Sequence, residues 1–211
     1  MPEVFRIDRD DAAVATIRRA ADLVRRGLVI AYPTDTVYGL AVDPRNAAAV
    51  RRLFGLKGRP ETSALTLIAS NIDQVQAVAE ITEEGARLAA QFWPGPLTIV
   101  FCARPGIAVE TLAGGMTVGV RVPDDAVARA LAREAGFCVT ATSANRTGQP
   151  AASSAGAVVE ALPGVDGILD AGESCGGAAS TIVDASTAAV TLIRAGAIAW
   201  DRVLKSLSSG A

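Results

Sequence analysis

The sequence predicts an α/β domain, and three observations support this. Short apolar runs of strand length alternate along the chain with segments whose apolar residues recur at helical spacing. Glycine or proline separates most of these segments, as expected at helix ends and in turns. Half of the 211 residues are hydrophobic, which is enough for a sizeable core. Because no repeat, low-complexity tract or linker interrupts the chain, we expect a single domain over residues 1–211.

The N-terminal half is expected to begin with a helix over residues 11–26. Asp10 or Asp11 is a suitable N-cap for it, and Gly27 is a suitable stop. The further elements expected here are helices at about 46–56, 72–79 and 83–92, and strands at 28–32, 65–68 and 97–101. A polar segment, residues 33–39, follows the first strand directly, and such strand ends usually carry binding groups in α/β proteins.

The C-terminal half continues the alternation. The elements expected here are strands at 117–122, 137–140, 181–183 and 190–193, a helix over 124–135 that stops at Gly136, and a helix near 153–161. A second polar cluster, residues 141–145, is placed after the strand at 137–140. The sequence thus predicts two polar clusters that follow strands, and both are candidates for a binding site.

The chain contains no histidine, and this limits the chemistry more than any other feature of the composition. Ser-His-Asp and Cys-His catalysis, His-ligated metals and imidazole proton shuttles are all excluded. The cysteines, Cys102, Cys138 and Cys175, are odd in number and widely spaced, so we expect neither a disulfide framework nor a zinc site. We expect Cys102 and Cys138 to be small buried hydrophobic residues.

No targeting or membrane signal is evident in the sequence. The first ten residues mix charges and lack the apolar region of a signal peptide, and no later stretch is apolar over the length of a membrane span. We therefore expect a soluble, cytoplasmic protein. Its 20 basic and 22 acidic residues give a net charge of -2, so any anion must be held by a local cluster of cations.

The usual nucleotide and hydrolase motifs are absent, which argues against P-loop kinases, Rossmann dehydrogenases and α/β-hydrolases. What remains is a set of polar residues at the ends of expected elements: Thr34, Thr36, Lys57, Arg59, Arg121, Ser143, Asn145, Ser180, Thr181 and Arg194. The four cations among them are enough to offset most of the charge of a triphosphate if they converge.

Each of these clusters also has an ordinary structural interpretation. Lys57 and Arg59 follow a helix, where the helix dipole favours solvated cations. Arg121 and Arg194 each close an apolar strand and could protect a sheet edge or form ion pairs. The Ser143–Asn145 run could be only a turn. The residues alone leave these alternatives open, and it is their combination that favours a site.

The ordered motifs resemble those of the YrdC/TsaC threonylcarbamoyl-adenylate synthase family. Seven motifs occur in order over about residues 10–200, which makes a chance match improbable. The motifs are Tyr32-Pro33-Thr34-Asp35-Thr36-Val37-Tyr38-Gly39-Leu40, Lys57-Gly58-Arg59-Pro60, Trp93-Pro94-Gly95-Pro96-Leu97-Thr98, Val120-Arg121-Val122-Pro123, Ser143-Ala144-Asn145, Ser180-Thr181-Ile182 and Ile193-Arg194-Ala195-Gly196. Residues 61–64, Glu-Thr-Ser-Ala, depart from the family, in which many members carry lysine or asparagine before proline or glycine.

The resemblance implies a YrdC-like twisted mixed sheet flanked by helices, with a concave basic cavity in which ATP and L-threonine lie side by side. Magnesium would accompany the phosphates, and no protein metal site is implied. The residues that the resemblance assigns to ATP are Lys57, Arg59, Ser143, Asn145 and Arg194, of which Lys57 and Arg59 would be catalytic. Those that it assigns to threonine are Thr34, Arg121, Thr142, Ser180 and Thr181, although Arg59 and Arg121 could exchange roles.

The implied reaction joins L-threonine, bicarbonate or CO2 and ATP into threonylcarbamoyl-AMP and pyrophosphate, for the N6-threonylcarbamoyladenosine modification of tRNA. The implied partners are the tRNA-modifying threonylcarbamoyl-transferase complex and, through weak contact, tRNA, with no membrane. Because the chain ends soon after Arg194, it resembles the short single-domain form. Two alternatives are an RNA-binding or ribosome maturation factor and a carbamoyl-transfer module. The net charge and the 4% aromatic content weigh against a broad RNA-binding surface.

Overall fold

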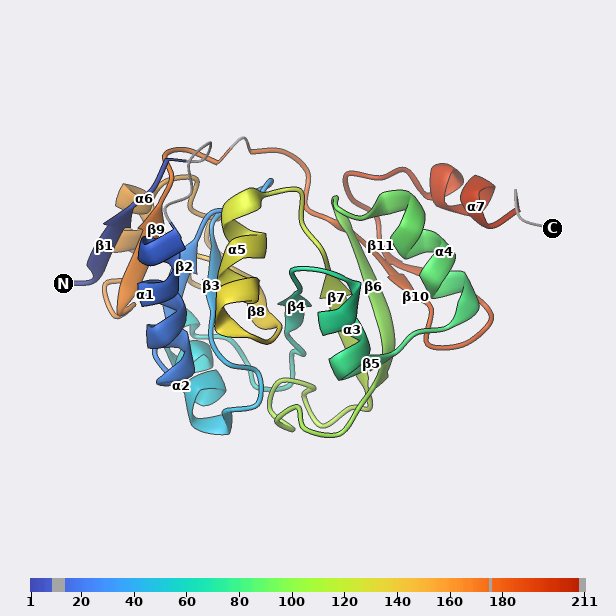
Figure 1. Ribbon diagram of the computed structural model, residues 1–211, viewed down its shortest axis with the longest axis horizontal. Helices are drawn as coiled ribbons and strands as arrows, with labels where there is room; N and C mark the ends of the chain where they lie inside the picture. The colour runs from blue at the N-terminus through green and yellow to red at the C-terminus, as the bar shows by residue number, and fades with distance from the viewer. Residues whose placement is uncertain (9–13, 175, 209–211) are drawn as a thin grey trace.

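One twisted mixed β-sheet forms the centre of the molecule (Figure 1). The computed structural model describes residues 1–8, 14–174 and 176–208. The strands follow one another across the sheet in the order β1-β9-β2-β3-β8-β4-β7-β6-β10-β11, and β5 pairs with β6. Their bounds are β1 Glu3–Arg6, β2 Ile30–Tyr32, β3 Gly39–Ala41, β4 Thr66–Ile68, β5 Ala79–Glu80, β6 Leu97–Ala103, β7 Thr117–Arg121, β8 Val139–Ser143, β9 Gly167–Asp170, β10 Thr181–Asp184 and β11 Thr191–Arg194.

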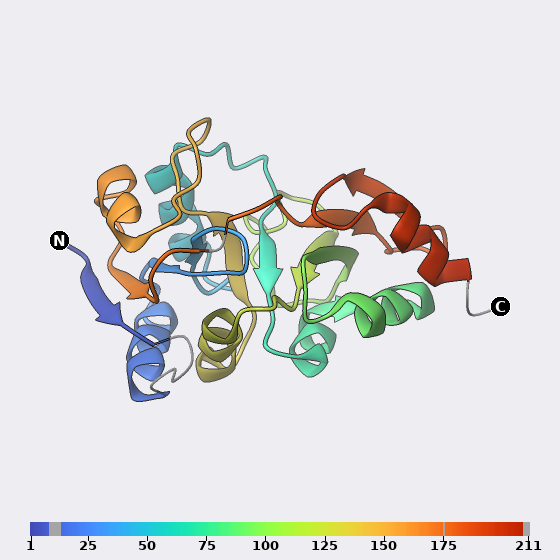
Figure 2. The ribbon, with the colours of Figure 1, turned by 90° about the horizontal axis from the view of Figure 1, so that it is seen from above.

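Helices cover both faces of the half of the sheet that contains β1, β9 and β2. Figure 2 shows α1 and α5 on one face of this half, with α2 and α6 on the opposite face, while α3, α4 and α7 cover the other half. The bounds are α1 Val14–Arg25, α2 Ala47–Lys57, α3 Ile72–Val78, α4 Glu83–Phe92, α5 Ala126–Ala135, α6 Ala155–Ala161 and α7 Trp200–Ser208.

The segment around β2 shows how a continuous apolar run serves two cores. Ile30 and Tyr32 face the cluster formed with α1 and α5, whereas Val29 and Ala31 face the cluster formed with α2 and α6. All four side chains are fully buried. Because successive strand residues point to opposite faces, a strand covered on both faces is apolar at every position.

Among the described strands, β8 alone joins the two halves of the sheet. Residues 139–141 pair antiparallel with β4, and residues 142 and 143 pair antiparallel with β3. The predicted site residues Thr142 and Ser143 therefore lie inside this strand and not after it, as we had expected from the sequence. The two polar clusters, residues 33–39 and 141–145, are far apart in the chain but close together in space, because β3 and β8 are neighbours in the sheet.

The structure confirms most of the expected helices and strands to within a few residues and adds five elements. The strands β1, β3, β5 and β9 and the helix α7 were not expected. The four strands have two to four residues each, too short to show a clear alternation. The proposed caps Asp10 and Asp11 lie outside the described residues.

Two further expectations from the sequence concern the cysteines and the membrane. Cys138 is buried, as expected, but Cys102 is partly exposed, so the expectation that it is buried is wrong. Cys175 lies outside the described residues. Within the described ranges, none of the helices has the length and apolar character needed to cross a membrane.

Candidate functional site

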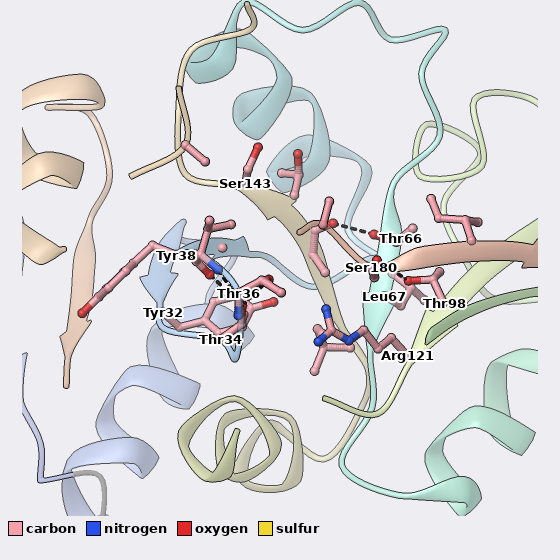
Figure 3. A pocket seen from close by; sticks show the side chains of 18 of the residues that line it. Tyr32, Thr34, Thr36, Tyr38, Thr66, Leu67, Thr98, Arg121, Ser143 and Ser180 are labelled. Atoms are coloured by element: carbon pink, nitrogen blue, oxygen red, sulfur yellow. Dashed lines mark hydrogen bonds between the residues drawn. The ribbon is translucent and has the colours of Figure 1, made fainter. Parts of the chain in front are cut away.

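A cavity of about 510 Å³ lies where the two halves of the sheet meet. Its size suits a small-molecule ligand. In Figure 3, Thr34 and Thr36 lie on one side of it, and Arg121, Thr98 and Ser180 lie on the other, with Ser143 at the end of β8 between them. The cavity therefore brings together residues that are more than 140 positions apart in the sequence.

Three arginines line the cavity: Arg59, Arg121 and Arg194. No aspartate or glutamate is among the described residues that line it. Two of these arginines are close enough for one to affect the ionisation of the other. Burial, and then the charge of Arg121, lower the pKa of Arg194. Like charges held together in this way favour an anionic ligand that neutralises them.

Arg59 has a buried hydrogen-bond donor that is not satisfied within the described part of the protein. Its Nη2 donates to the carbonyl of Ala64 at 3.0 Å, and its Nη1 is 3.5 Å from Oγ1 of Thr142. Its Nε is buried and, in the described part of the chain, has no hydrogen-bond partner. Burial lowers the pKa of Arg59. Because an unpaired buried donor is costly, an anion that pairs with this guanidinium would be stabilised.

Arg121 is buried and held from two sides. Its Nε donates to the carbonyl of Gly95 at 2.8 Å, and its Nη2 donates to both carboxylate oxygens of Asp35. Because β7 lies between β4 and β6, Arg121 is not on an edge strand, so the edge-protection interpretation is wrong. The ion-pair interpretation is correct, but the same arginine also lines the cavity.

Ser180 is the centre of a second polar group. Its hydroxyl is 3.0 Å from that of Thr98, and Nη2 of Arg194 donates to both its hydroxyl and its carbonyl, at 3.2 and 2.7 Å. Thr98 is buried, with 2% of its surface exposed. Since Thr98 can donate to the Ser180 oxygen, the Ser180 hydroxyl can be oriented to donate into the cavity.

Thr34 shapes the loop that faces this group. Its hydroxyl donates to the carbonyl of Val37 at 2.7 Å and accepts the backbone N–H groups of Thr36 and Val37 at 3.1 and 3.2 Å. This is a hydroxyl turn that closes within the chain. The Thr34 hydroxyl is therefore occupied within the loop, and Thr36 is the neighbouring hydroxyl that lines the cavity.

The family resemblance assigns ten residues to ATP or threonine. Seven of them line the cavity: Thr34, Arg59, Arg121, Thr142, Ser143, Ser180 and Arg194. The other three, Lys57, Asn145 and Thr181, are buried behind it. Thr181 uses its hydroxyl to donate to the carbonyl of Ile198 at 2.7 Å and to accept its N–H at 2.9 Å. This hydroxyl therefore ties β10 to the start of the α7 segment.

Lys57 does not lie in a solvated loop, so the interpretation of it as a solvated charge is wrong. It is the last residue of α2, whose C-cap, Gly58, has a φ of 58° in the left-handed region. Its side chain turns inward, and only 3% of the residue is exposed. The spacing placed it correctly at the helix end but could not show which way its side chain points.

The sequence analysis missed several residues that line the cavity, among them the hydroxyls of Thr66 and Thr98 and the ring of Tyr32. Thr66 Oγ1 donates to the carbonyl of Ala141 at 2.6 Å, and the Tyr32 hydroxyl donates to that of Thr140 at 3.0 Å. Thr66 lies in a β-strand, where threonine is common, so nothing in the sequence distinguished it as a site residue. Thr98 and Tyr32 are part of two of the seven family motifs, and that was a signal for both, but neither was assigned to the site.

The fold and the cavity define an α/β protein with a small-molecule site suited to an anion. A comparison of the sequence with known families gives the specific assignment. Residues 22–196 match the Sua5/YciO/YrdC family, whose description is "Telomere recombination". The chain belongs to this family.

Named relatives support the same assignment. The chain is 37% identical over 192 residues to a threonylcarbamoyl-AMP synthase of Pyrococcus abyssi, covering 90% of this chain and 56% of that protein. It is 42% identical over 156 residues to one of Idiomarina loihiensis, covering 72% and 83%. The crystal structure of P. abyssi Sua5 complexed with L-threonine matches with a TM-score of 0.91 and 34% identity, over 96% of this chain and 60% of that one. The chain thus spans about half the length of some curated relatives that it matches.

Proposed function

We propose that this protein is an L-threonylcarbamoyladenylate synthase, which makes threonylcarbamoyl-AMP and pyrophosphate from L-threonine, bicarbonate or CO2, and ATP. The observation that carries the proposal is the cavity lined by three arginines and several hydroxyls, in a chain whose fold matches the threonine complex of P. abyssi Sua5. Among the reactants, ATP carries an anionic triphosphate and threonine carries a carboxylate, and a cavity lined by arginines suits both groups.

The cavity residues divide into two groups in this proposal. Arg59, Ser143 and Arg194 would hold the phosphates of ATP, and Arg121 would hold the threonine carboxylate, with the Ser180 hydroxyl pairing with the β-hydroxyl of threonine. The unpartnered buried Nε of Arg59 supports a role in anion binding. Lys57, Asn145 and Thr181 are proposed to act behind the cavity wall, because each is buried and bonded within the protein.

The chemistry needs positioned charge more than a strong base. The amine of threonine attacks CO2 to give a carbamate and releases a proton to solvent. A carbamate oxygen then forms a bond to the α-phosphorus of ATP, and the bond from that phosphorus to the bridging oxygen breaks, so pyrophosphate leaves. The arginines stabilise the charge that develops on the phosphate oxygens and hold the reactants together. This scheme is consistent with a chain that has no histidine.

Magnesium would accompany the triphosphate and neutralise part of its charge. Among the described residues, no group of three or more Cys, Asp or Glu side chains could hold a metal ion. We propose that the phosphate oxygens supply part of the coordination of this ion, as is usual for magnesium bound with a nucleotide.

The wider role follows from the same assignment. We propose that the product passes to a threonylcarbamoyl-transferase complex that modifies tRNA, in the cytoplasm, and that residues 1–211 act as one domain. A broad RNA-binding surface is less well supported, because many surface arginines are already paired with carboxylates. These pairs include Arg18–Glu134, Arg19–Glu3, Arg25–Asp22, Arg51–Glu110, Arg52–Asp166 and Arg87–Glu83.

The test is to incubate the protein with ATP, magnesium, bicarbonate and L-threonine and to measure pyrophosphate and the mass of threonylcarbamoyl-AMP. Pyrophosphate should require threonine and bicarbonate together. Arg59→Gln should lose activity, whereas Arg51→Gln, which removes a surface arginine paired with Glu110, should retain it. Release of orthophosphate, or of pyrophosphate without threonine, would overturn the proposal. Salt-dependent filter binding of tRNA tests the RNA-binding alternative separately.

A further inference from the structure

We propose that Lys57 is a positioning residue: its buried ammonium holds the Ser143–Asn145 turn in place behind the cavity wall and does not contact the nucleotide. The part of this proposal that concerns the nucleotide rests on the proposed function. The contrast with Arg59, two residues further on, is clear, because Arg59 lines the cavity and Lys57 does not.

Acceptors inside the protein saturate the Lys57 ammonium. Nζ donates to the carbonyl of Ser143, to the carbonyl of Asn145 at 2.8 Å and to Oδ1 of Asn145 at 3.3 Å. An ammonium has three N–H donors and no acceptor. All three donors are therefore accounted for within the protein, and a phosphate could be contacted only if at least one of these bonds broke.

Further hydrogen bonds hold the Ser143–Asn145 turn together and attach it to Lys57. Asn145 donates through Nδ2 to the carbonyls of Arg146, at 3.0 Å, and Gln149, and its Oδ1 also accepts the Ser143 hydroxyl. The backbone carbonyl of Lys57 accepts the N–H of Thr147 at 2.8 Å. Lys57 is thus bonded to both the start and the end of the segment 143–147, and it fixes that segment to the end of α2.

The turn is connected directly to the cavity through Ser143. Ser143 is the last residue of β8, pairs with Gly39 of β3 and lines the cavity. Its carbonyl accepts from Lys57 and its hydroxyl donates to Asn145 Oδ1, so the same network sets both the backbone and the side chain that face the ligand. Since a displacement of about 1 Å can cost on the order of 100-fold in rate, this support is functionally important.

The ionisation of Lys57 agrees with this environment. Burial, and then the neighbouring charge of Arg59, lower its pKa to about 8. The acceptors that face Nζ are neutral carbonyl and amide oxygens, and no carboxylate offsets the cost of burying the charge among the described residues that bond to it. A buried charge without a counter-ion is costly unless it is hydrogen-bonded, and the three hydrogen bonds of the Lys57 ammonium offset this cost.

The first experiment measures the accessibility of the amine in the unliganded protein. The chain contains only two lysines, Lys57 and Lys205, and Lys205 lies in α7 on the surface, so it is an internal control. The protein is treated with a limiting amount of an amine-acylating reagent at pH 8.5, and both peptides are quantified by mass spectrometry. Because a pKa of about 8 leaves much of the Lys57 amine neutral at this pH, low reactivity reports burial.

We expect Lys57 to be acylated on the order of 100-fold more slowly than Lys205, because its reaction requires local opening. Similar rates for the two lysines would show that Nζ is exposed to the cavity and would overturn the proposal. This measurement needs neither ATP nor activity, so it remains decisive even if the proposed function fails.

The second experiment is a double-mutant cycle on ATP binding. Lys57→Met keeps the length of the side chain and removes its charge and donors, and thermal melting checks that it folds. We expect it to weaken ATP binding about 10- to 100-fold in the wild-type background. In the Ser143→Ala background its further effect should fall below about threefold, because the cavity-lining hydroxyl that Lys57 positions through this turn is already absent.

Additive effects in the cycle would indicate that Lys57 contacts the phosphates directly and would overturn the proposal. Arg59→Gln is the matched comparison, since Arg59 lines the cavity, and its effect should add to that of Ser143→Ala. If the wild-type protein does not bind ATP at all, the proposed function fails and the nucleotide part of this inference fails with it. The acylation result would then report on the buried network alone.

Discussion

Gly196→Ala should inactivate the protein through a contact between two backbone segments. A Cβ added at Gly196 would lie 2.3 Å from the carbonyl oxygen of Ala179 and 2.5 Å from the backbone atoms Ser180 C and Thr181 N. These are backbone atoms, which cannot move aside as the end of a flexible side chain can. The segment 179–181 must therefore shift, and it carries Ser180, which lines the cavity and binds Arg194.

The size of the effect follows from this overlap. Normal contacts between such atoms are about 3.5 Å, so the segment must move by about 1 Å. Overpacking of this kind usually costs about 1–3 kcal/mol of stability. A displacement of about 1 Å at positioned groups can cost on the order of 100-fold in rate. We therefore expect a modest loss of stability and a larger loss of activity.

The assay is pyrophosphate release at saturating ATP, bicarbonate and threonine, with urea unfolding measured on the same preparation. Gly55→Ala is the matched control, because a Cβ at Gly55 in α2 meets nothing within 4 Å. That variant should be fully active. If Gly196→Ala keeps wild-type activity and stability, then the close packing of residue 196 against the segment 179–181 does not position Ser180, and the reasoning is refuted.

Three further predictions concern charge, selectivity and pH. Asp35→Asn should lower the free energy of unfolding by about 3 kcal/mol, because the buried Arg121 loses its counter-charge; a change below about 0.5 kcal/mol in urea unfolding would contradict this. If Ser180 pairs with the substrate hydroxyl, pyrophosphate release should be fastest with threonine, slower with serine and slowest with valine. Serine should be about 10- to 200-fold less efficient than threonine, and valine should be rejected on the order of 10^4-fold. Equal rates for serine and valine would contradict this pairing. Because burial lowers the pKa of Lys57 from about 10.5 to about 8, the unfolded chain binds more protons than the folded protein between these pH values. The free energy of unfolding should therefore rise from pH 8 to 10.5 in the wild type relative to Lys57→Met, and parallel pH profiles would count against this.

The long elements of this fold could be predicted from the sequence, because their periodicity and caps are local. The helix α2 shows this well, since Asn46 caps its start by accepting the N–H of Ala49, and Gly58 ends it. The two-residue strand β5 and the three-residue strand β3 could not be predicted, because their formation depends on distant partners in the sheet.

The site was predictable as a set of residues but not as a geometry. The motifs identified the arginines and hydroxyls, and seven of the ten predicted residues line one cavity. Arg59 lines the cavity, whereas the side chain of Lys57 points to the Ser143–Asn145 turn. Sequence spacing could not show this difference, because both residues lie at the end of the same helix, α2. Nor could it show that the Thr34 hydroxyl is used within its own loop.

The joint at β8 has a consequence for cooperativity. The pairing between the two halves of the sheet depends on one strand of five residues, of which three pair with β4 and two with β3. In the unliganded protein, the halves are therefore candidates for separate cooperative units in native-state hydrogen exchange. A ligand that spans the cavity from Thr36 to Ser180 would couple these units. When the cavity is filled, hydrogen exchange should therefore slow together in the amides of strands far from the ligand, namely β1, β9, β10 and β11.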